Sequence, residues 1–180
     1  MEEKMEAIKN LAELETLVKE RDTPKMSVAF AQDEDTILAV NRAVDEKIID
    51  GILIGDQKKI EAICEKLNIP SDKFEIINEP DEKKSGLKAV ELIIEGKAQL
   101  LMKGLISTPY FLKAILNKEY NLIKKGQVLS HSAVIDIDTY DKLLIASDVA
   151  MIPYPDLAQK IQILNYNIDI ASKLGIENPK

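Results

Sequence analysis

The stretch LLMKGLISTPYFLKAIL, residues 100–116, combines residue types that could bind an anion. Its apolar first half predicts a strand that ends near Lys103, and its amphipathic second half predicts a helix that begins near Thr108. Thr108 is a typical N-cap residue, and Pro109 suits the first turn because its missing N–H has no intrahelical partner there. The free N–H groups of such a helix start attract negative charge, and the Lys103 ammonium would add a full positive charge. This pattern favours an anion-binding turn.

Lys103 and Gly104 each leave an alternative open. A lysine near a helix N-terminus opposes the helix dipole, which favours an anionic partner, whereas simple solvation of the side chain is the alternative. Gly104 would let the backbone approach a ligand closely, or it would supply a turn residue with positive φ. The chain contains neither the glycine-rich dinucleotide fingerprint nor the P-loop pattern, so NAD and ATP are disfavoured.

The only histidine, His131, lies in GQVLSHSAVIDI at the start of a predicted strand, between Ser130 and Ser132. Serine beside histidine suggests nucleophilic chemistry. Adjacent residues of a strand point to opposite faces, however, so these three side chains cannot form a hydrogen-bonded triad among themselves. A hydrogen-bonded structural histidine is therefore favoured over a catalytic one, and a ligand-binding role for His131 stays open.

The other reactive residue types have structural explanations. The single cysteine, Cys64, excludes an internal disulfide and a cysteine-cluster metal site, and its helical spacing with apolar neighbours predicts a buried thiol. Asp33 or Asp35, Asp56 and Asp81 follow predicted strands and precede predicted helices, where an aspartate caps a helix or stabilises its first turn. We expect no metal site.

Charge and hydropathy disfavour several classes of protein. The 180 residues carry a formal net charge of −7, and their Lys and Arg residues are scattered, which disfavours nucleic acid and anionic membrane surfaces as partners. No apolar run is long enough to span a bilayer, and the N-terminal MEEKMEAIKNL is charged and helical in pattern rather than signal-like. These two features predict a cytoplasmic protein. With 46% hydrophobic but only 4% aromatic residues, the sequence also predicts a globular protein with an aliphatic core.

Strand and helix patterns alternate along most of the chain, which predicts parallel strands joined by crossover helices. We expect an α/β fold in which helices, a mostly parallel sheet and further helices form successive layers. Late in the chain, HSAVIDIDTYDKLLIASD predicts two strands around a short turn and hence one hairpin in a mixed sheet. The predicted strands are MSVAFA, GILIG, FEIIN, AQLLMKG, SAVIDI and KLLIAS, and the predicted helices cover 5–20, 36–48, 58–67, 82–96, 110–116 and 155–174.

The end of the sequence determines the expected domain organisation. A long amphipathic helix is stopped by Gly175 and followed by Asn178 and Pro179, which is typical of a helix that leads into a strand. Because no strand follows, we expect the chain to be the first part of a longer protein. Residues 1–154 would form an N-terminal α/β domain, and residues 155–180 would lead into a second α/β domain that this chain lacks.

Four segments resemble the N-terminal half of one family of acyltransferases. They are VAFAQDEDTILAVNRAVDEKIIDGILIGD, FEIINEPDEKKSGLKAVELIIEGKAQLLMKGL, LSHSAVIDIDTYDKLLIASDVAM and LGIENPK, and the resemblance covers nearly the whole chain from residue 26. The motif MKGL, a Thr-containing helix start, the segment SHSAV and then GIENPK occur in the family's order and with similar spacing. On these motifs the chain is identified as a member of the phosphate acetyl/butyryltransferase family, and it is more similar to the butyryl branch.

The resemblance implies an activity and its partners. Family members transfer an acyl group reversibly, so that acyl-CoA and inorganic phosphate give acyl phosphate and CoA in a cleft between two α/β domains. The resemblance implies no metal and no tightly bound cofactor, coenzyme A as a substrate, butyryl as the acyl group, and a homodimer or higher homo-oligomer. Two other hypotheses stay open: a non-catalytic phosphate- or CoA-binding α/β module, and an interaction or regulatory domain without a pocket.

The resemblance also implies the residues of the site. The helix position that resembles a family arginine is Lys113, which keeps the charge but loses the bidentate fork that suits phosphate. The serine and aspartate that the family is thought to use on the CoA thiol lie in a C-terminal part that this chain lacks. The resemblance therefore assigns no catalytic residue within this chain, and His131 stays a candidate. The implied phosphate or acyl-phosphate pocket consists of Lys103, Gly104, Ser107, Thr108, Lys113, Ser130 and His131.

Overall fold

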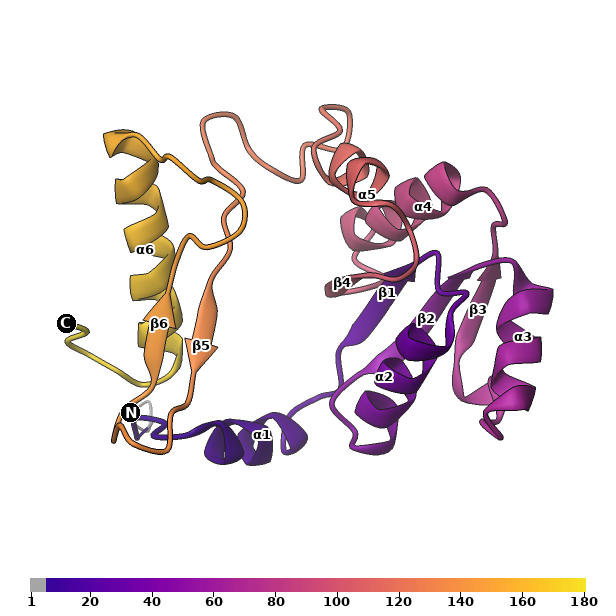
Figure 1. The fold of residues 1–180 in the computed structure, drawn as a ribbon, viewed down its shortest axis with the longest axis horizontal. Coiled ribbons are helices and arrows are strands. Elements are labelled where there is room, and N and C mark those ends of the chain that lie inside the picture. Colours follow the sequence, from indigo (N-terminus) through magenta and orange to yellow (C-terminus); the bar gives the residue numbers. More distant parts are fainter. Residues whose placement is uncertain (1–5) are drawn as a thin grey trace. The chain divides into compact units, whose positions relative to one another are not determined.

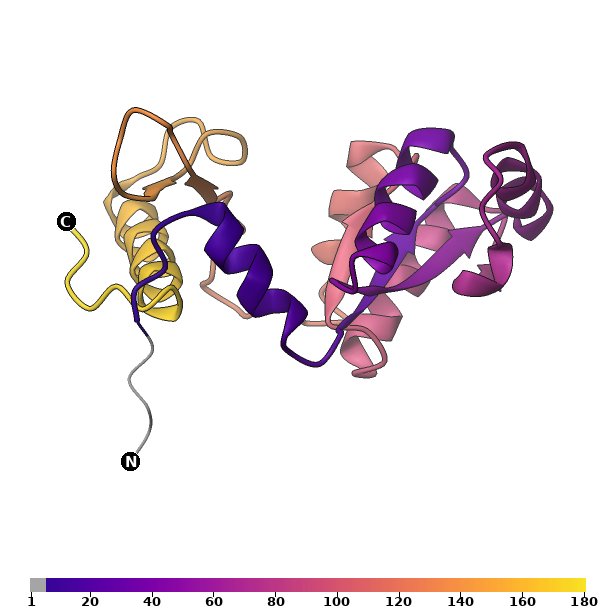
Figure 2. The same cartoon turned by 90° about the horizontal axis from the view of Figure 1, so that it is seen from below.

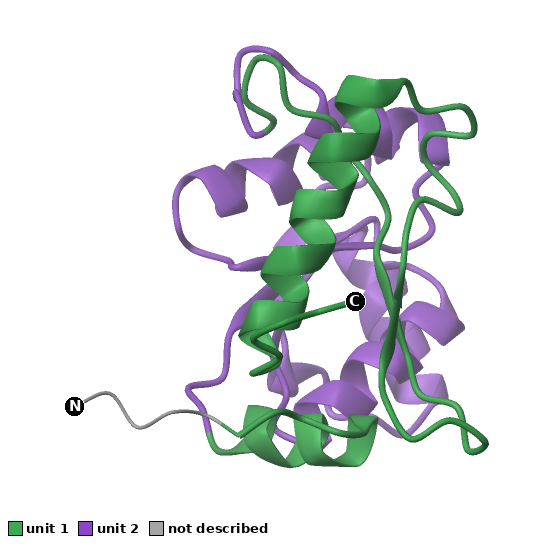
Figure 3. Ribbon diagram, turned by 90° about the vertical axis from the view of Figure 1, so that its left-hand side faces the viewer, with its two compact units in different colours: residues 1–20, 123–180 green, residues 21–122 purple. Residues whose placement is uncertain are grey.

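The computed structural model describes residues 6–180, which form two compact units (Figure 1, Figure 3). Unit 1 is Met1–Glu20 together with Ile123–Lys180, and unit 2 is the continuous segment Arg21–Leu122. Residue 5, the predicted first residue of the first helix, lies outside the described residues. Unit 1 is therefore assembled from two segments that are far apart in the sequence.

Unit 2 contains a four-stranded parallel sheet with the strand order β3-β2-β1-β4 (Figure 1). All the strands and helices that the sequence predicts in this unit are present, with bounds that differ by a few residues, so the expected α/β fold class is confirmed. The strands are β1 (Lys25–Ala29), β2 (Asp50–Gly55), β3 (Glu75–Asn78) and β4 (Leu100–Lys103), and the helices are α2 (Glu34–Asp45), α3 (Gln57–Lys66), α4 (Glu82–Ile94) and α5 (Thr108–Ile115).

The sheet of unit 2 has helices on both faces, which gives the expected three layers (Figure 2). Consecutive strand residues point to opposite faces of the sheet, so each strand contributes side chains to two hydrophobic cores. Val28 and Leu53 pack with apolar residues of α2 and α3, whereas Ala29 and Ile54 pack with residues of α4 and with Ile106. These five side chains are fully buried, with 0% exposure, and they fix the sheet between the two helix layers.

Aspartates cap three helices of unit 2, as predicted. The side-chain oxygens of Asp33, Asp56 and Asp81 accept hydrogen bonds from backbone N–H groups in the first turns of α2, α3 and α4. Each bond satisfies an N–H group that has no partner inside its helix. Cys64 on α3 is 1% exposed, and burial raises the pKa of its thiol, which confirms a buried thiol rather than an activated one.

Unit 1 contains α1 (Leu11–Lys19), the antiparallel strands β5 (Ala133–Ile135) and β6 (Leu144–Ala146), and the long helix α6 (Leu157–Lys173). The hairpin is present, but the expectation that it joins the parallel sheet is wrong, because β5 and β6 form a sheet of their own. Val134 and Ile145 instead pack against a small core of Ile8, Leu143 and Leu174. This small core belongs to unit 1 alone. The expected division at residue 154, with a second domain beyond this chain, stays a prediction.

The two ends of the described chain show one wrong and one correct helix boundary. The first helix begins at Leu11 rather than at residue 5, because Asn10 caps it and accepts a hydrogen bond from the Glu13 N–H at 2.9 Å. The Glu13 carboxylate in turn accepts from the Lys9 N–H at 2.8 Å. The last helix ends where predicted, since Gly175 follows it with a φ of 78°.

Candidate functional site

The strand order of unit 2 locates a candidate ligand site at one edge of its sheet. The chain runs outward from β1 through β2 to β3 and then returns to the other side of β1 to form β4. In open α/β sheets, ligands bind beyond the carboxyl ends of the strands at such a change of direction. Lys103 is the last residue of β4 and pairs in register with Ala29 of β1, so it lies at this position.

Gly104 begins the turn after β4 and packs directly on the end of β1. Its N–H donates to the Ala29 carbonyl at 3.0 Å, and the N–H of Leu105 donates to the Phe30 carbonyl at 3.0 Å. A Cβ atom at position 104 would lie 2.8 Å from the Ala29 oxygen, so a side chain does not fit. Gly104 is not among the glycines with positive φ, and the turn-conformation alternative is therefore wrong. The glycine is required by the close approach of two backbone segments.

Phe30 holds an unusual backbone conformation at the same edge. Its φ of 57° lies in the left-handed region, which costs a bulky residue on the order of 1–3 kcal/mol. The surrounding structure compensates: the buried Ser85 hydroxyl of α4 accepts from the Phe30 N–H at 2.7 Å and donates to the Ile54 carbonyl at 3.2 Å. Phe30 thus links the end of β1, helix α4 and the turn that begins at Gly104.

Helix α5 begins two residues earlier than the predicted range 110–116, and its N-cap lies one residue earlier than expected. Ser107 is the N-cap, and Thr108 and Pro109 are the first two helical residues, so the prediction that Thr108 caps the helix is wrong. The Ser107 hydroxyl makes no capping bond; instead its backbone N–H donates to the Glu82 carboxylate at 2.6 Å. Pro109, the second helical residue, has no N–H group. The N–H groups of Thr108 and Tyr110, on either side of it, have no protein acceptor among the described residues.

The resulting turn presents several donors to solvent. Lys103, Ser107 and Thr108 are all exposed, and among residues 6–180 no carboxylate pairs with the Lys103 ammonium, whose contact is the Gly104 carbonyl at 3.5 Å. An ammonium, two hydroxyls and two free N–H groups within eight residues can donate to an anion such as phosphate. The structure therefore brings together four of the residues implied for the pocket, namely Lys103, Gly104, Ser107 and Thr108.

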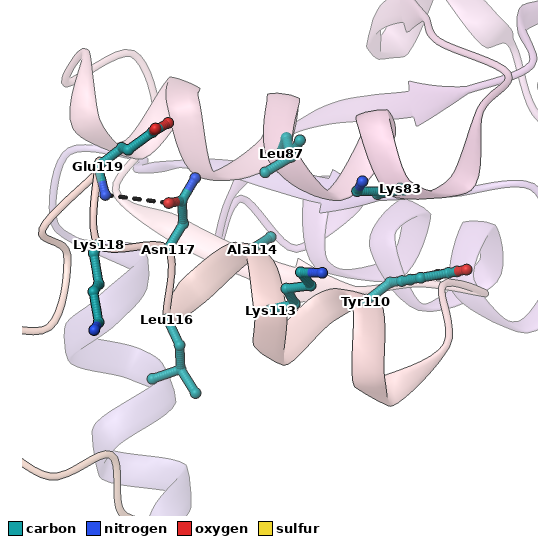
Figure 4. Close-up of a pocket in the computed structure, with 9 residues that line it drawn as sticks. All are labelled: Lys83, Leu87, Tyr110, Lys113, Ala114, Leu116, Asn117, Lys118 and Glu119. Atoms are coloured by element: carbon teal, nitrogen blue, oxygen red, sulfur yellow. Dashed lines mark hydrogen bonds between the residues drawn. The ribbon is translucent and has the colours of Figure 1, made fainter.

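Lys113 lies in a different place from this turn. It lines an open depression of about 530 Å³ between α4, α5 and the segment that follows α5 (Figure 4). Lys103, Ser107 and Thr108 are not among the residues that line the depression. Its basic side chains are those of Lys83, Lys113 and Lys118, its acidic side chain is Glu119, and its other lining residues are Leu87, Tyr110, Ala114, Leu116 and Asn117.

Ser130 and His131 belong to unit 1, where Asp148 holds both. The Ser130 hydroxyl donates to the Asp148 carboxylate at 2.9 Å, and the His131 backbone N–H donates to the same oxygen at 3.2 Å. The other oxygen accepts from the N–H groups of Met151 and Ala150 at 2.7 and 2.9 Å. These bonds, led by the one from Met151, hold the pKa of Asp148 well below its usual range.

The histidine ring itself takes no part in these bonds. His131 Nδ1 is buried without a hydrogen-bond partner, and neither neighbouring serine hydroxyl bonds to the ring. Ser132 instead lies 2.8 Å from the Ser147 hydroxyl and 3.0 Å from Asn167 Oδ1 on α6. The prediction that the three consecutive residues cannot form a triad is confirmed.

Sequence reasoning did not select Asp148, Ser147, Asn167 or Glu82 as site residues. Ser147 ends the predicted strand KLLIAS and Asp148 directly follows it, and this position at the carboxyl end of a strand was the available signal for both residues. Asn167 and Glu82 lie within helices, and their contacts cross between elements, so no local pattern marks them.

Two further observations concern ligands and membranes. Among residues 6–180, no three His, Cys, Asp or Glu side chains gather in an arrangement that could hold a metal ion. In the same part of the chain, no helix is both long enough and apolar enough to cross a membrane.

Comparison with known proteins identifies the family. The family model described as phosphate acetyl/butaryl transferase matches residues 82–180, which is more than half of the chain. The chain belongs to this family. As a phosphate acetyl/butyryltransferase family member, it is 45% identical over 173 residues to the phosphate butyryltransferase of Clostridium acetobutylicum, a match that covers 96% of this chain and 57% of that protein. It is 34% identical over 156 residues to the phosphate acetyltransferase of Thermotoga maritima, covering 87% of this chain and 52% of that protein.

One solved structure agrees with the family assignment, and a second shares the fold. A branched-chain phosphotransacylase from Enterococcus faecalis V583 matches with a TM-score of 0.75 and 26% identity, over 87% of this chain and 54% of that one. A phosphotransacetylase from Streptococcus pyogenes shares the fold, with a TM-score of 0.60 and 16% identity over 76% of this chain and 50% of that one. The chain spans little more than half the length of the curated relatives that it matches.

Proposed function

We propose that this protein transfers a short acyl group reversibly between coenzyme A and phosphate, and that butyryl-CoA is its preferred acyl donor. The observation that carries the proposal is the exposed donor set of the turn after β4, at the change of direction of the sheet. The 45% identity to a phosphate butyryltransferase supports the butyryl preference. The family assignment supports acyl transfer in general.

The chemistry of this reaction explains why such a turn is needed. One phosphate oxygen attacks the carbonyl carbon of the thioester, a C–O bond forms, the C–S bond breaks, and the sulfur leaves as a thiolate that takes up a proton. Phosphate must be held with its attacking oxygen oriented, which requires positive charge and fixed donors. Lys103 supplies the charge, and the free N–H groups of α5 with the Ser107 and Thr108 hydroxyls supply the directed donors.

We further propose that Gly104 shapes the phosphate-binding turn, and that Ser130, His131 and Lys113 also bind phosphate or acyl phosphate. Gly104 sets the path of the turn, and Asp148 fixes the Ser130 hydroxyl and the His131 backbone. The Nδ1 atom of His131 is buried and has no hydrogen-bond partner among the described residues. Lys113 contributes a positive charge on α5. We assign His131 a binding role in this proposal, since no neighbouring hydroxyl is placed to be activated by its ring.

The proposal includes the setting in which the protein works. Acyl-CoA, acyl phosphate and inorganic phosphate are its small-molecule partners, and coenzyme A is a substrate rather than a bound cofactor. We propose a homodimer or higher homo-oligomer in the cytoplasm, without a nucleic-acid or membrane partner. The net charge of −7 supports the last point, because it disfavours polyanionic surfaces.

A thiol-release assay tests the proposed function. The full-length protein is incubated with acetyl-, propionyl- or butyryl-CoA, with and without phosphate, and free CoA thiol is measured. We expect phosphate-dependent release, with the highest kcat/KM for butyryl-CoA. A higher kcat/KM for acetyl-CoA would overturn the butyryl preference. A protein that is stabilised by phosphate in a melting experiment but releases no thiol would instead be a non-catalytic binding module.

A further inference from the structure

The N-terminal face of α4 holds the turn that follows β4. Glu82, Ser85 and Gly86 are spaced i, i+3 and i+4, so they lie on one side of the helix. The Glu82 carboxylate accepts from the Ser107 N–H at 2.6 Å, and Ser85 binds the Phe30 N–H. A Cβ atom at Gly86 would lie 2.6 Å from the Cδ1 atom of Ile106, so this glycine leaves the space that the buried Ile106 side chain fills.

Glu82 supplies a bond that α5 cannot make for itself. In many helices a Glu or Gln at the third helical position accepts from the N-cap N–H, but this position in α5 is Tyr110. Glu82 takes that role from α4, through a short bond to a charged acceptor, which is stronger than a bond between neutral groups. The carboxylate thereby fixes the start of α5 relative to α4.

This bond also decides which donors remain available. The Ser107 N–H is engaged by Glu82, whereas the Ser107 and Thr108 hydroxyls and the N–H groups of Thr108 and Tyr110 have no protein acceptor among the described residues. We propose that Glu82 is a positioning residue for the phosphate-binding turn. Its carboxylate orients these donors toward phosphate and does not itself bind phosphate. The inference rests on the proposed phosphate site.

The geometry and the charge of Glu82 have opposite effects on phosphate. Its oxygen orders the turn, which favours binding, while its negative charge near the turn repels a phosphate dianion. The Glu82→Gln variant keeps an acceptor oxygen and removes the charge, whereas Glu82→Ala removes both. Both variants lose the same favourable interaction of a negative charge with the start of α4. A difference in phosphate KM or in hydrogen exchange between them therefore reports the effect of the acceptor oxygen.

The experiment compares Glu82→Ala and Glu82→Gln with Glu95→Ala as the matched control. Glu95 is the residue that ends α4, is exposed, and forms an ion pair with Lys97, far along the helix from the turn. Steady-state kinetics of the full-length protein give separate KM values for phosphate and butyryl-CoA. Amide hydrogen exchange of the segment 104–110 is measured on the same proteins without substrates.

We expect Glu82→Ala to raise the KM for phosphate about tenfold, because the Ser107 N–H loses its acceptor and the turn loses its order, with less than a twofold change for butyryl-CoA. Glu82→Gln should keep the phosphate KM at or below the wild-type value, and Glu95→Ala should match the wild type. Hydrogen exchange in 104–110 should accelerate in Glu82→Ala and stay near the wild-type rate in the other two.

Three results would overturn the inference: an unchanged phosphate KM in Glu82→Ala, equal losses in Glu82→Ala and Glu82→Gln, or unchanged hydrogen exchange in Glu82→Ala. The first two need an active wild-type protein. A wild-type protein without phosphate-dependent thiol release would contradict the proposed function instead, and hydrogen exchange would still decide whether Glu82 holds the turn.

Discussion

Replacing Ser85 by alanine should destabilise the protein more than the same replacement at Ser27. Both serines are fully buried, and both substitutions remove one hydroxyl, so the loss of packing is matched. They differ in their partners. Ser85 is the acceptor for the Phe30 N–H at 2.7 Å, whereas Ser27 donates to the carbonyl oxygens of Ala89 and Leu100 at 3.0 and 3.3 Å.

The expected magnitudes follow from these partners. Ser85→Ala leaves the Phe30 N–H without an acceptor in a partly buried position, which costs about 2 kcal/mol within a usual range of about 1–3. The Ile54 carbonyl loses the Ser85 bond but still accepts from the Ala31 N–H at 2.8 Å, so it adds little. Ser27→Ala removes a donor and leaves only carbonyl acceptors, for which we expect about 0.5–1 kcal/mol.

Relaxation of Phe30 does not cancel this cost. The left-handed conformation of Phe30 is strained, so losing the Ser85 bond would favour a return to an ordinary φ. Such a return would break the bond from the Leu105 N–H to the Phe30 carbonyl and disturb the turn after β4. We therefore expect Ser85→Ala to lower the affinity for phosphate as well as the free energy of unfolding.

Urea unfolding of the wild type and both variants, in phosphate-free buffer, measures the two free-energy differences. At about 4 °C per kcal/mol for a unit of roughly 100 residues, Ser85→Ala should also lower Tm by roughly 8 °C and Ser27→Ala by roughly 2–4 °C. An equal or larger loss in Ser27→Ala would refute the reasoning, because it would show that the unpaired Phe30 N–H carries no special cost.

Three further predictions concern single residues. Lys103→Ala should weaken phosphate binding about tenfold to hundredfold with little change in Tm, because the side chain is exposed; an unchanged KM for phosphate and kcat would mean a merely solvated lysine. Cys64→Ala should lower Tm modestly and leave kcat unchanged, since the thiol is buried with a raised pKa; loss of activity in a folded variant would make Cys64 a candidate nucleophile. Asp148→Asn should lower Tm at pH 7, and the difference in Tm from the wild type should narrow as the pH falls below about 4. The native carboxyl has a lowered pKa, so its ionised form stabilises the fold above the pKa of the unfolded state, and this contribution is lost on acidification. A difference in Tm that does not depend on pH would contradict this assignment.

The parts of the fold that depend on local signals could be predicted from the sequence. Asp33, Asp56 and Asp81 cap helices because an aspartate before a helical pattern needs only the backbone of the next turn. The end of α6 at Gly175 is equally local. The N-cap of α5 was misplaced by one residue because serine and threonine are both good caps. The choice of Ser107 accompanies a contact from Glu82, which is 25 positions away.

The candidate site was predictable where it follows a strand and obscure where it depends on long-range packing. Lys103 was found because the ends of parallel strands are the usual ligand-binding edge. The reason for Gly104 was missed, since the neighbouring carbonyl of Ala29 belongs to a strand distant in sequence. Asp148 was passed over because its role arises from four donors, two of which come from the residues before β5. Such coupling has no periodicity that a sequence pattern can reveal.

The two-segment construction of unit 1 sets an order of events during synthesis. The Leu11 N–H donates to the Asp136 carboxylate, a partner that lies 125 positions later. At about 5–20 residues per second, the ribosome needs roughly 6–25 s to supply that partner, while a 100-residue domain folds faster than this. Unit 2 is one continuous segment of the chain, so it can fold before residues 123–180 have been synthesised. The segment that contains α1 then has no folded partner until those residues follow. Folding of unit 2 also makes the chain between the two segments of unit 1 compact. The entropy cost of bringing these two segments together is then smaller than the cost of closing a flexible loop of the same length.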